Sequence, residues 1–431
     1  MTTIDTHVDD KTFTKYESEV RSYCRNWPAI FDTAQGAWLT DVDGNKYLDF
    51  FAGAGALNYG HNDPDLKEAL LRHLVRDGIT HGLDMSTVAK GEFLQTFHDR
   101  ILAPRNLDYK VQFPGPTGTN AVESALKLAR KVTGRESIVS FTNAFHGMTL
   151  GSLSVTGNAT KRAGAGVPLV HSTPMPFDDY FDGAVEDFGW FTRVLDDHGS
   201  GLNRPAAVIV ETIQGEGGVN VARAEWLSAL AELCQSREIL LIVDDVQMGC
   251  GRTGEFFSFE IADIKPDIVT LSKSISGYGL PMALTLLKPE HDVWNPGEHN
   301  GTFRGNNPAF VTATTALNKY WSDDLLTRDV HRKGAIISET FAGLSEKYEG
   351  VTHRGRGMVQ GLVFDEPELA GKVCALAYED RLLAETSGPS DEVVKLLPPL
   401  TIDEDDLQRG LDILSKAVAA VATERTPEVA E

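Results

Sequence analysis

Two short runs of apolar residues near the middle of the chain carry its strongest hydrophobic pattern. The first covers residues 239–243 and ends at Asp244, and the second covers residues 267–271 and ends just before Lys273. Continuous apolar runs of this length predict strands that are buried on both faces of a parallel sheet. If the two strands are neighbours, Asp244 and Lys273 converge at the carboxyl edge of the sheet, where open α/β folds bind ligands.

Apolar positions elsewhere follow strand-like or helical spacing. Two alternating runs around residues 43–45 predict a β-hairpin. Residues 158–204 have weak periodicity and predict surface structure with one helix near 190–196. Further strands are predicted at residues 109–113, 137–141, 206–211 and 282–287, and helices at about 64–76, 121–130, 225–234, 308–347 and 404–420.

The order of these elements predicts the fold class. Strands and helices alternate through the middle of the chain, so we expect an α/β domain with a mainly parallel sheet and a smaller α+β domain built from both chain ends. The expected boundaries place residues 1–65 in the small domain, residues 66–310 in the large domain and residues 311–431 in the small domain again.

Residues 114–120, Pro-Gly-Pro-Thr-Gly-Thr-Asn, join a predicted strand to a predicted helix. The first turn of a helix presents backbone N–H groups without partners inside the helix, so this unit can cradle a phosphate. The segment lacks the Gly-Lys-Ser/Thr ending of a nucleotide P-loop, and an ordinary helix cap is the alternative. The glycine-rich segment 51–61 predicts a second loop, whose backbone approaches a neighbour closely.

The expected pair of Asp244 and Lys273 suits pyridoxal phosphate. A lysine amine can form a Schiff base with this cofactor, while a carboxylate keeps its pyridine nitrogen protonated. A structural ion pair at the edge of the sheet is the alternative explanation of the spacing.

Composition narrows the class of protein. The chain has 431 residues, of which 42% are hydrophobic and 24% charged, as is typical of a globular protein with a large core. A formal charge of −22 opposes binding to nucleic acid or to an anionic membrane. The sequence has no apolar run of membrane-spanning length and no export signal, so we expect a cytoplasmic location. The spacing of the four cysteines and twelve histidines predicts no metal site.

Residues 244–254, Asp-Asp-Val-Gln-Met-Gly-Cys-Gly-Arg-Thr-Gly, resemble the signature Asp-Glu-Val-Gln-Thr-Gly-x-Gly-Arg-Thr-Gly of class III aminotransferases, the ornithine and GABA type. Four other segments, 117–123, 145–147, 211–218 and 299–308, resemble further motifs of this family in the family's order. The resemblance covers about residues 20 to 420. It implies a fold type I transferase that uses pyridoxal 5'-phosphate.

The resemblance also implies roles for single residues. Lys273 corresponds to the lysine that holds the cofactor, and Asp244 to the acid that faces its ring nitrogen. Phe145, in a Phe-His-Gly motif, corresponds to the aromatic residue on the ring face, although core packing would explain it equally well. The complete set of implied cofactor contacts is Gly118, Thr119, Phe145, His146, Val246, Gln247 and Thr302.

Two residues are implied at the substrate. Glu211 corresponds to a glutamate that helps to gate the two substrates, and Lys395 stands where many members of the family have an arginine. A lysine cannot form the planar fork of an arginine, so we expect a looser hold on the substrate carboxylate. Our hypothesis is that Lys395 pairs with Glu211 when no α-carboxylate is bound. The alternative is that Lys395 is a solvated surface residue.

The resemblance extends to partners and substrates. In this family the threonine that matches Thr302 reaches the cofactor phosphate of the neighbouring subunit, so at least a dimer is implied. Segments 20–28, 52–64 and 81–85 resemble the branch that transfers the amino group of L-glutamate to L-aspartate 4-semialdehyde, giving L-2,4-diaminobutyrate in ectoine biosynthesis. The alternatives are an ornithine, acetylornithine or 4-aminobutyrate aminotransferase, a decarboxylase or aminomutase on the same scaffold, and a cofactor-sensing regulator.

Overall fold

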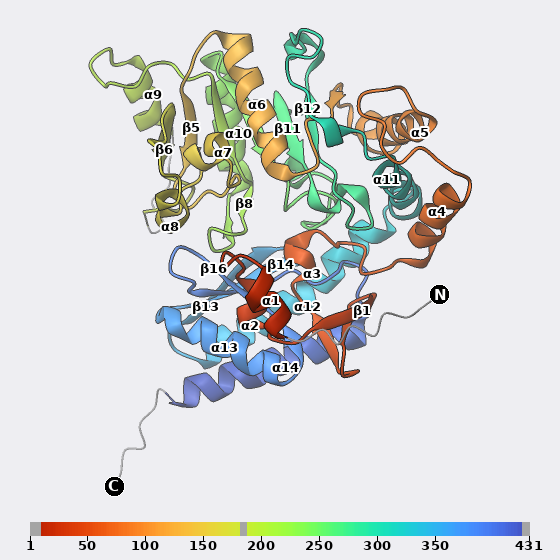
Figure 1. Cartoon of the computed structure of the whole chain (residues 1–431). Coiled ribbons are helices and arrows are strands. Elements are labelled where there is room, and N and C mark those ends of the chain that lie inside the picture. The colour runs from red at the N-terminus through yellow and green to blue at the C-terminus, as the bar shows by residue number, and fades with distance from the viewer. Residues whose placement is uncertain (1–9, 182–187, 425–431) are drawn as a thin grey trace.

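The computed structural model describes residues 10–181 and 188–424. A large sheet with its covering helices occupies one part of the molecule, and elements from both chain ends lie together in another part (Figure 1). The helices are α1 (Asp10–Tyr16), α2 (Tyr23–Asn26), α3 (Ala52–Gly55), α4 (Pro64–Val75), α5 (Val88–Phe97), α6 (Gly118–Thr133), α7 (Leu150–Ser154), α8 (Ala159–Ala163), α9 (Gly189–Asp196), α10 (Ala224–Ser236), α11 (Asn307–Tyr320), α12 (Leu325–Lys347), α13 (Pro367–Glu379) and α14 (Glu404–Glu424).

The large sheet has seven strands in the order β4-β12-β11-β10-β7-β5-β6. Of these, β12 runs antiparallel to both of its neighbours, while the other pairs are parallel. This confirms the predicted α/β class with a mainly parallel sheet. The strands are β4 (Lys110–Gln112), β12 (Leu284–Leu287), β11 (Ile268–Leu271), β10 (Leu240–Asp244), β7 (Ala207–Val210), β5 (Ile138–Phe141) and β6 (Ser172–Met175).

The central strands are buried on both faces because helices cover each side. In β10, Ile242 belongs to the same buried cluster as Leu126 of α6. The next residue, Val243, belongs to a second cluster that includes Trp226 and Leu230 of α10. Since neighbouring residues of a strand point to opposite faces, α6 and α10 lie on opposite sides of the sheet. This double cover explains why the strands are continuously apolar in sequence.

Two smaller four-stranded sheets lie outside the large one, and the first of them combines strands from both chain ends. The first has the order β1-β2-β3-β15, and the parallel pairing of β3 with β15 joins the N-terminal hairpin to the C-terminal region. The second has the order β13-β14-β17-β16, and a two-stranded pair, β8 and β9, stands apart. These strands are β1 (Phe31–Gln35), β2 (Trp38–Asp41), β3 (Lys46–Asp49), β8 (Ile213–Gln214), β9 (Asn220–Val221), β13 (Val351–Arg356), β14 (Val359–Phe364), β15 (Leu382–Leu383), β16 (Glu385–Ser387) and β17 (Val393–Leu396).

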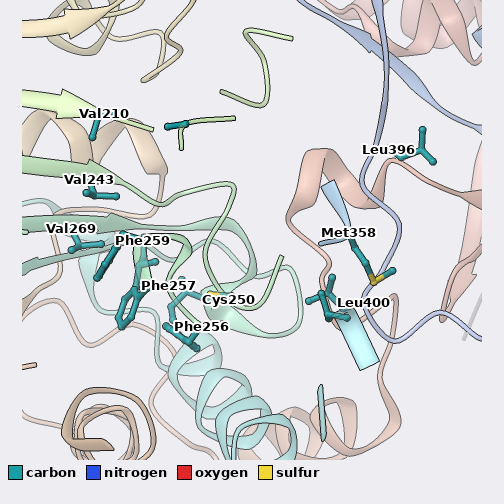
Figure 2. Close-up of a cluster of buried hydrophobic side chains, with 14 of the residues drawn as sticks. Val210, Val243, Cys250, Phe256, Phe257, Phe259, Val269, Met358, Leu396 and Leu400 are labelled. Carbon is teal, nitrogen blue, oxygen red and sulfur yellow. The ribbon is translucent and has the colours of Figure 1, made fainter. Parts of the chain in front are cut away.

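One buried cluster extends from the large sheet to the C-terminal elements. Val243 and Val269 of the sheet belong to the same cluster as Met358, Leu396 and Leu400. Figure 2 shows the valines at the strands on one side and the C-terminal residues on the other. Apolar burial of this kind is the main favourable contribution to folding, so the two parts of the molecule stabilise each other.

The structure differs from the predicted elements in two places. The span 158–204 contains α8 and the edge strand β6 in addition to the predicted helix, which is α9. The strand β6 is mostly half-exposed and has the sequence Ser-Thr-Pro-Met, so it lacks the apolar run of a central strand. The predicted helix at 308–347 is two helices, α11 and α12, separated by residues 321–324. The expected domain boundaries, including the one at residue 310 within α11, stay a prediction.

Among the described residues, the helices are too short or too polar to traverse a lipid bilayer.

Candidate active site

The ends of β10 and β11 bring Asp244 and Lys273 into one region. The two strands pair in parallel, and Asp244 lies opposite Thr270 in the register. Lys273 follows β11 as the first residue of a single turn, η4 (Lys273–Ser276). The prediction that the two strands are neighbours is therefore confirmed.

Lys273 is held in an uncommon backbone conformation. Its φ angle is 53°, a left-handed value that costs a non-glycine residue about 1 kcal/mol or more. Its Nζ donates a hydrogen bond to the carbonyl oxygen of Ala54, in the turn α3, at 2.7 Å. The glycine-rich segment thus brings its backbone close to the lysine. Burial lowers the pKa of Lys273 to about 8, so a neutral, nucleophilic amine is accessible near neutral pH.

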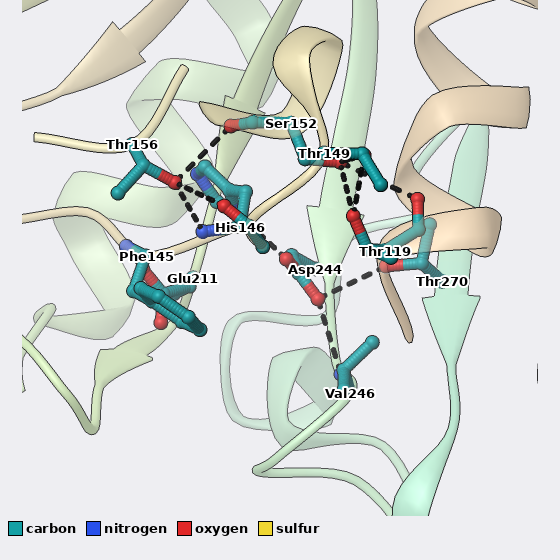
Figure 3. A network of polar contacts seen from close by, with 11 residues as sticks. Thr119, Phe145, His146, Thr149, Ser152, Thr156, Glu211, Asp244, Val246 and Thr270 are labelled. Carbon is teal, nitrogen blue, oxygen red and sulfur yellow. Dashed lines mark hydrogen bonds and ion pairs between the residues drawn. The ribbon is translucent and has the colours of Figure 1, made fainter. Parts of the chain in front are cut away.

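Asp244 accepts three hydrogen bonds. His146 Nδ1 lies 2.7 Å from its Oδ2, and Thr270 Oγ1 and the backbone N of Val246 lie 3.0 and 3.2 Å from its Oδ1 (Figure 3). These donors fix the orientation of the carboxylate at the end of β10. The adjacent Asp245 is fully buried and accepts hydrogen bonds from Ser258 instead. Its burial raises its pKa to about 7.

A cavity of about 290 Å³ opens between these strand ends and the start of α6. Within the described ranges 10–181 and 188–424, Lys273 is the one lysine or arginine that lines it. The residues predicted for the site that line this cavity are Gly118, Thr119, Phe145, His146, Glu211, Asp244, Val246, Gln247 and Lys273. Thr302 and Lys395 are predicted site residues that do not line it.

The start of α6 forms one end of the cavity. Thr117, which precedes the helix, lines the cavity together with Gly118 and Thr119. A Cβ atom on Gly118 would lie 2.8 Å from Cγ1 of Val246, so only glycine allows this close approach. Thr119 Oγ1 exchanges a hydrogen bond of 2.7 Å with Thr149 Oγ1. A helix start with free N–H groups and a hydroxyl provides the donors that a phosphate requires.

Phe145 and Val246 approach the cavity from different segments. The backbone N of Phe145 donates to Glu211 Oε2 at 2.9 Å, which ties the aromatic residue to the end of β7. Burial, together with the carboxylate of Asp244, raises the pKa of Glu211 well above its usual value. Gln247 Nε2 donates to the carbonyl oxygen of Ala54 at 3.0 Å. The residues that the family resemblance implied around a ring are thus gathered in one place.

Lys395 lies on β17 beside two carboxylates, and Glu211 is neither of them. Its Nζ lies 2.6 Å from Glu216 Oε1 and 3.1 Å from Glu385 Oε1, and its side chain is fully buried. The hypothesis that Lys395 pairs with Glu211 is therefore wrong, as is the alternative of a solvated lysine. Glu211 ends a strand and is engaged by Phe145, whereas Glu216 lies in the following loop and reaches both the cavity and Lys395.

Burial and neighbouring charges shift the pKa values of Lys395, Glu216 and Glu385 in opposite directions. Burial alone would raise the pKa of Glu216, but the ammonium groups of Lys395 and Lys273 lower it below its usual range. Burial raises the pKa of Glu385 even though Lys395 opposes the rise. Conversely, the two carboxylates raise the pKa of Lys395 against the effect of burial. Lys395 therefore stays charged at neutral pH.

Comparison with known proteins agrees with this geometry. The family description Aminotransferase class-III matches residues 21–418. The chain belongs to the class-III aminotransferase family. It is 67% identical over 423 residues to a protein named diaminobutyrate–2-oxoglutarate transaminase from Nocardia farcinica, covering 98% of this chain and 96% of the relative. A protein of the same name from Streptomyces anulatus is 68% identical over 410 residues, covering 95% and 98%.

Solved structures agree on the fold of this class-III aminotransferase. The ornithine aminotransferase of Toxoplasma gondii, which holds PLP at its active site with partial occupancy, superposes with a TM-score of 0.83. It is 27% identical to this chain, and the match covers 96% of this chain and 94% of that one.

The cavity fits pyridoxal phosphate, the cofactor of this family. A carboxylate at Asp244 suits a protonated ring nitrogen, and the amine of Lys273 suits an aldehyde. The backbone N–H groups at the start of α6 suit a phosphate, and the absence of a side chain at Gly118 lets this helix start approach Val246 closely. Thr302 is exposed and is not among the residues that line the cavity of its own chain; it lies on a single turn, η6 (Thr302–Arg304).

Sequence reasoning missed two residues of the site. Glu216 was visible in the Gln-Gly-Glu motif of residues 214–216, but the motif did not show which of its glutamates faces Lys395. Glu385 had no sequence signal, because it lies on a short strand, β16, whose pairing with β17 places it opposite Lys395.

Proposed function

We propose that this aminotransferase transfers the amino group of L-glutamate to L-aspartate 4-semialdehyde and yields L-2,4-diaminobutyrate and 2-oxoglutarate. The observation that carries the reaction type is the half-buried Lys273, which lines one cavity together with Asp244. The substrates are supported by relatives at 67 and 68% identity that bear the name diaminobutyrate–2-oxoglutarate transaminase. Such a step belongs to ectoine biosynthesis.

Pyridoxal phosphate, when bound, supplies an electron sink for the bond broken at the substrate carbon. Lys273 would hold the cofactor and, once freed by the incoming amine, carry a proton to and from that carbon. Its lowered pKa leaves the amine able to accept this proton near neutral pH. Asp244, oriented by His146 and Thr270, would keep a negative charge opposite the ring nitrogen.

The remaining cofactor contacts follow from the lining of the cavity. Gly118 and Thr119 would hold the phosphate at the start of α6, and Phe145 and Val246 would enclose the ring. Gln247 would face the ring hydroxyl, where its amide can donate a hydrogen bond.

We assign the substrate gate to Lys395 and Glu216. Glutamate carries a carboxylate on the carbon that reacts, and this group would displace Glu216 from Lys395. Aspartate 4-semialdehyde carries no carboxylate on its reacting carbon, so the pair would stay closed in the second half-reaction. While the ion pair between Lys395 and Glu216 is intact, the charge of Lys395 stays next to a carboxylate and does not enter the cavity without a partner.

A homodimer with shared sites is part of the proposal. Thr302 is exposed and does not line its own cavity, so it is available to reach the cofactor phosphate of a second copy. Class-III aminotransferases act on amino and oxo acids and are typically oligomeric. We expect the enzyme to work in the cytoplasm.

The two half-reactions test this function separately. Absorbance of the bound cofactor should change when L-glutamate is added, with release of 2-oxoglutarate, and should return when L-aspartate 4-semialdehyde is added, with formation of diaminobutyrate. Ornithine, acetylornithine and 4-aminobutyrate serve as competing donors. If any of these three reacts with a higher kcat/KM than diaminobutyrate, the proposed substrate is wrong. If glutamate fails to convert the cofactor, the reaction type is wrong.

A further inference from the structure

A second cavity, of about 200 Å³, adjoins the first one. Phe145 and Glu216 line both cavities, so the two cavities meet at these two residues. The wall of the second cavity is rich in polar groups, including Asn158 and Thr160. Among the residues that the structure describes, Lys161 is the one lysine or arginine in its lining.

Lys161 presents its charge beside the aromatic residue of the site. It lies in the short helix α8, and its Nζ is 4.4 Å from the centre of the Phe145 ring. Its backbone N donates to Asn158 Oδ1 at 2.9 Å, which anchors the start of this helix. Within the ranges 10–181 and 188–424, the ion pairs do not include Lys161. Its ammonium group is therefore available to an anion.

Both proposed substrates bring a carboxylate that the main cavity cannot neutralise. The one lysine that lines this cavity, Lys273, is needed at the reacting carbon, and Lys395 is engaged by Glu216 and Glu385. A carboxylate taken out of water without a cation is costly. The second cavity, which shares Phe145 with the first, is lined by Lys161 and so offers an ammonium group to this carboxylate.

The two substrates have the same number of bonds between the reacting carbon and the distal carboxylate. In glutamate, three carbon–carbon bonds separate the reacting carbon, C2, from the side-chain carboxylate. In aspartate 4-semialdehyde, three carbon–carbon bonds separate the reacting carbon, C4, from the α-carboxylate. One cation at a fixed distance from Lys273 can therefore serve both half-reactions.

We propose that Lys161 binds the substrate carboxylate that is furthest from the reacting carbon, in both half-reactions. This inference rests on the proposed function. Lys395 has the complementary task, because only glutamate and 2-oxoglutarate place a carboxylate on the reacting carbon. The α-ammonium group of the semialdehyde then faces Glu216, which lines both cavities.

Lys161→Met tests the proposal, because methionine keeps an apolar stem against Phe145 and removes the charge. Half-reactions of the holoenzyme are followed by cofactor absorbance with L-glutamate and diaminobutyrate. L-alanine and 1,3-diaminopropane serve as amines without the distal carboxylate. Loss of a charge-assisted contact should weaken the apparent affinity for glutamate and diaminobutyrate about 10- to 100-fold. The maximal rates, the affinity for cofactor and the reactions of the two truncated amines should change less than about twofold.

Two variants serve as controls. Lys161→Arg should restore most of the affinity, since it returns the positive charge. Lys372→Met makes the same change on the exposed face of α13 and should leave every parameter unchanged.

The outcomes separate the proposal from the function it rests on. Unchanged affinity of Lys161→Met for glutamate overturns the role of Lys161, and so does an equal loss for the truncated amines, which would indicate a structural role. If the wild-type enzyme does not react with diaminobutyrate, the proposed function fails, and the comparison of glutamate with alanine still decides the role of Lys161.

Discussion

Replacing Lys395 by methionine removes the only cation that contacts both Glu216 and Glu385 among the described residues. The lysine side chain is fully buried, and those of Glu216 and Glu385 are 19% and 6% exposed. The change leaves two carboxylates close together with little water to solvate them. Removing one partner of a buried ion pair typically costs about 3–5 kcal/mol of stability.

This cost converts into a measurable change of Tm. Unfolding entropy of about 2.1 cal/mol/K per residue implies that a chain of 431 residues loses about 1 °C per kcal/mol. We therefore expect Lys395→Met to lower Tm by about 3–5 °C at pH 8, measured by calorimetry at one scan rate and one protein concentration. The variant Lys395→Arg, which keeps the charge, should lose less.

The decrease in Tm caused by Lys395→Met should depend on pH, and the pKa shifts of the two glutamates determine the direction. In the wild-type protein the pKa of Glu216 is lowered, so its contribution to stability is present above the unfolded value of about 4.3 and is lost as pH falls through the lower folded value. Without Lys395, burial would raise the pKa of both Glu216 and Glu385 above that value. The loss of folding stability caused by these two buried carboxylates then grows as pH rises from about 4.3. At lower pH both groups are protonated and the loss disappears.

The comparison of pH 8 with pH 5.5 is therefore decisive. At pH 5.5 the Tm deficit of Lys395→Met should be about half of its value at pH 8 or less. The double variant Lys395→Met/Glu385→Gln should recover part of the deficit at pH 8, because one buried charge is gone. Equal deficits at both pH values, together with no recovery in the double variant, would refute the reasoning. The same variant should raise the KM for glutamate about 10- to 100-fold, and an unchanged KM would contradict the proposed gate.

Three further predictions concern the cofactor. Lys273→Ala should abolish turnover. In the wild-type apoenzyme, the rate of cofactor capture should rise with pH up to about 8 and then level off, because only the neutral amine reacts. A rate independent of pH between 6.5 and 9 would contradict the lowered pKa of Lys273. Asp244→Asn should retain bound cofactor and lose about 10² to 10³ in kcat, because the amide removes the negative charge at the ring nitrogen; a rate within twofold of the parent would point to Asp245 instead. Gly118→Ala should weaken cofactor binding about tenfold in equilibrium titration, because the Cβ of the new alanine would lie 2.8 Å from Cγ1 of Val246. Gly371→Ala is the neutral control, because no heavy atom lies within 4 Å of the position of its Cβ.

Much of the cofactor site could be predicted from sequence because it depends on local features. Asp244 and Lys273 each follow a continuous apolar run, and the carboxyl ends of parallel strands meet at one edge of the sheet. Gly118 and Thr119 begin a helix whose period is visible in the sequence. These residues come together once the strands pair, whatever the details of the smaller domain.

The partners of Lys395 and the surroundings of Lys161 were decided by tertiary structure alone. Lys395 meets Glu385 because β16 and β17 pair in one register, and it meets Glu216 because a loop of the large domain reaches that sheet. Lys161 meets Phe145 through a short helix in a span without hydrophobic periodicity. Contacts of this kind join segments far apart in the chain, and their geometry depends on packing that no local pattern encodes. The polar groups that we propose to select the substrate could therefore be recognised only from the folded structure.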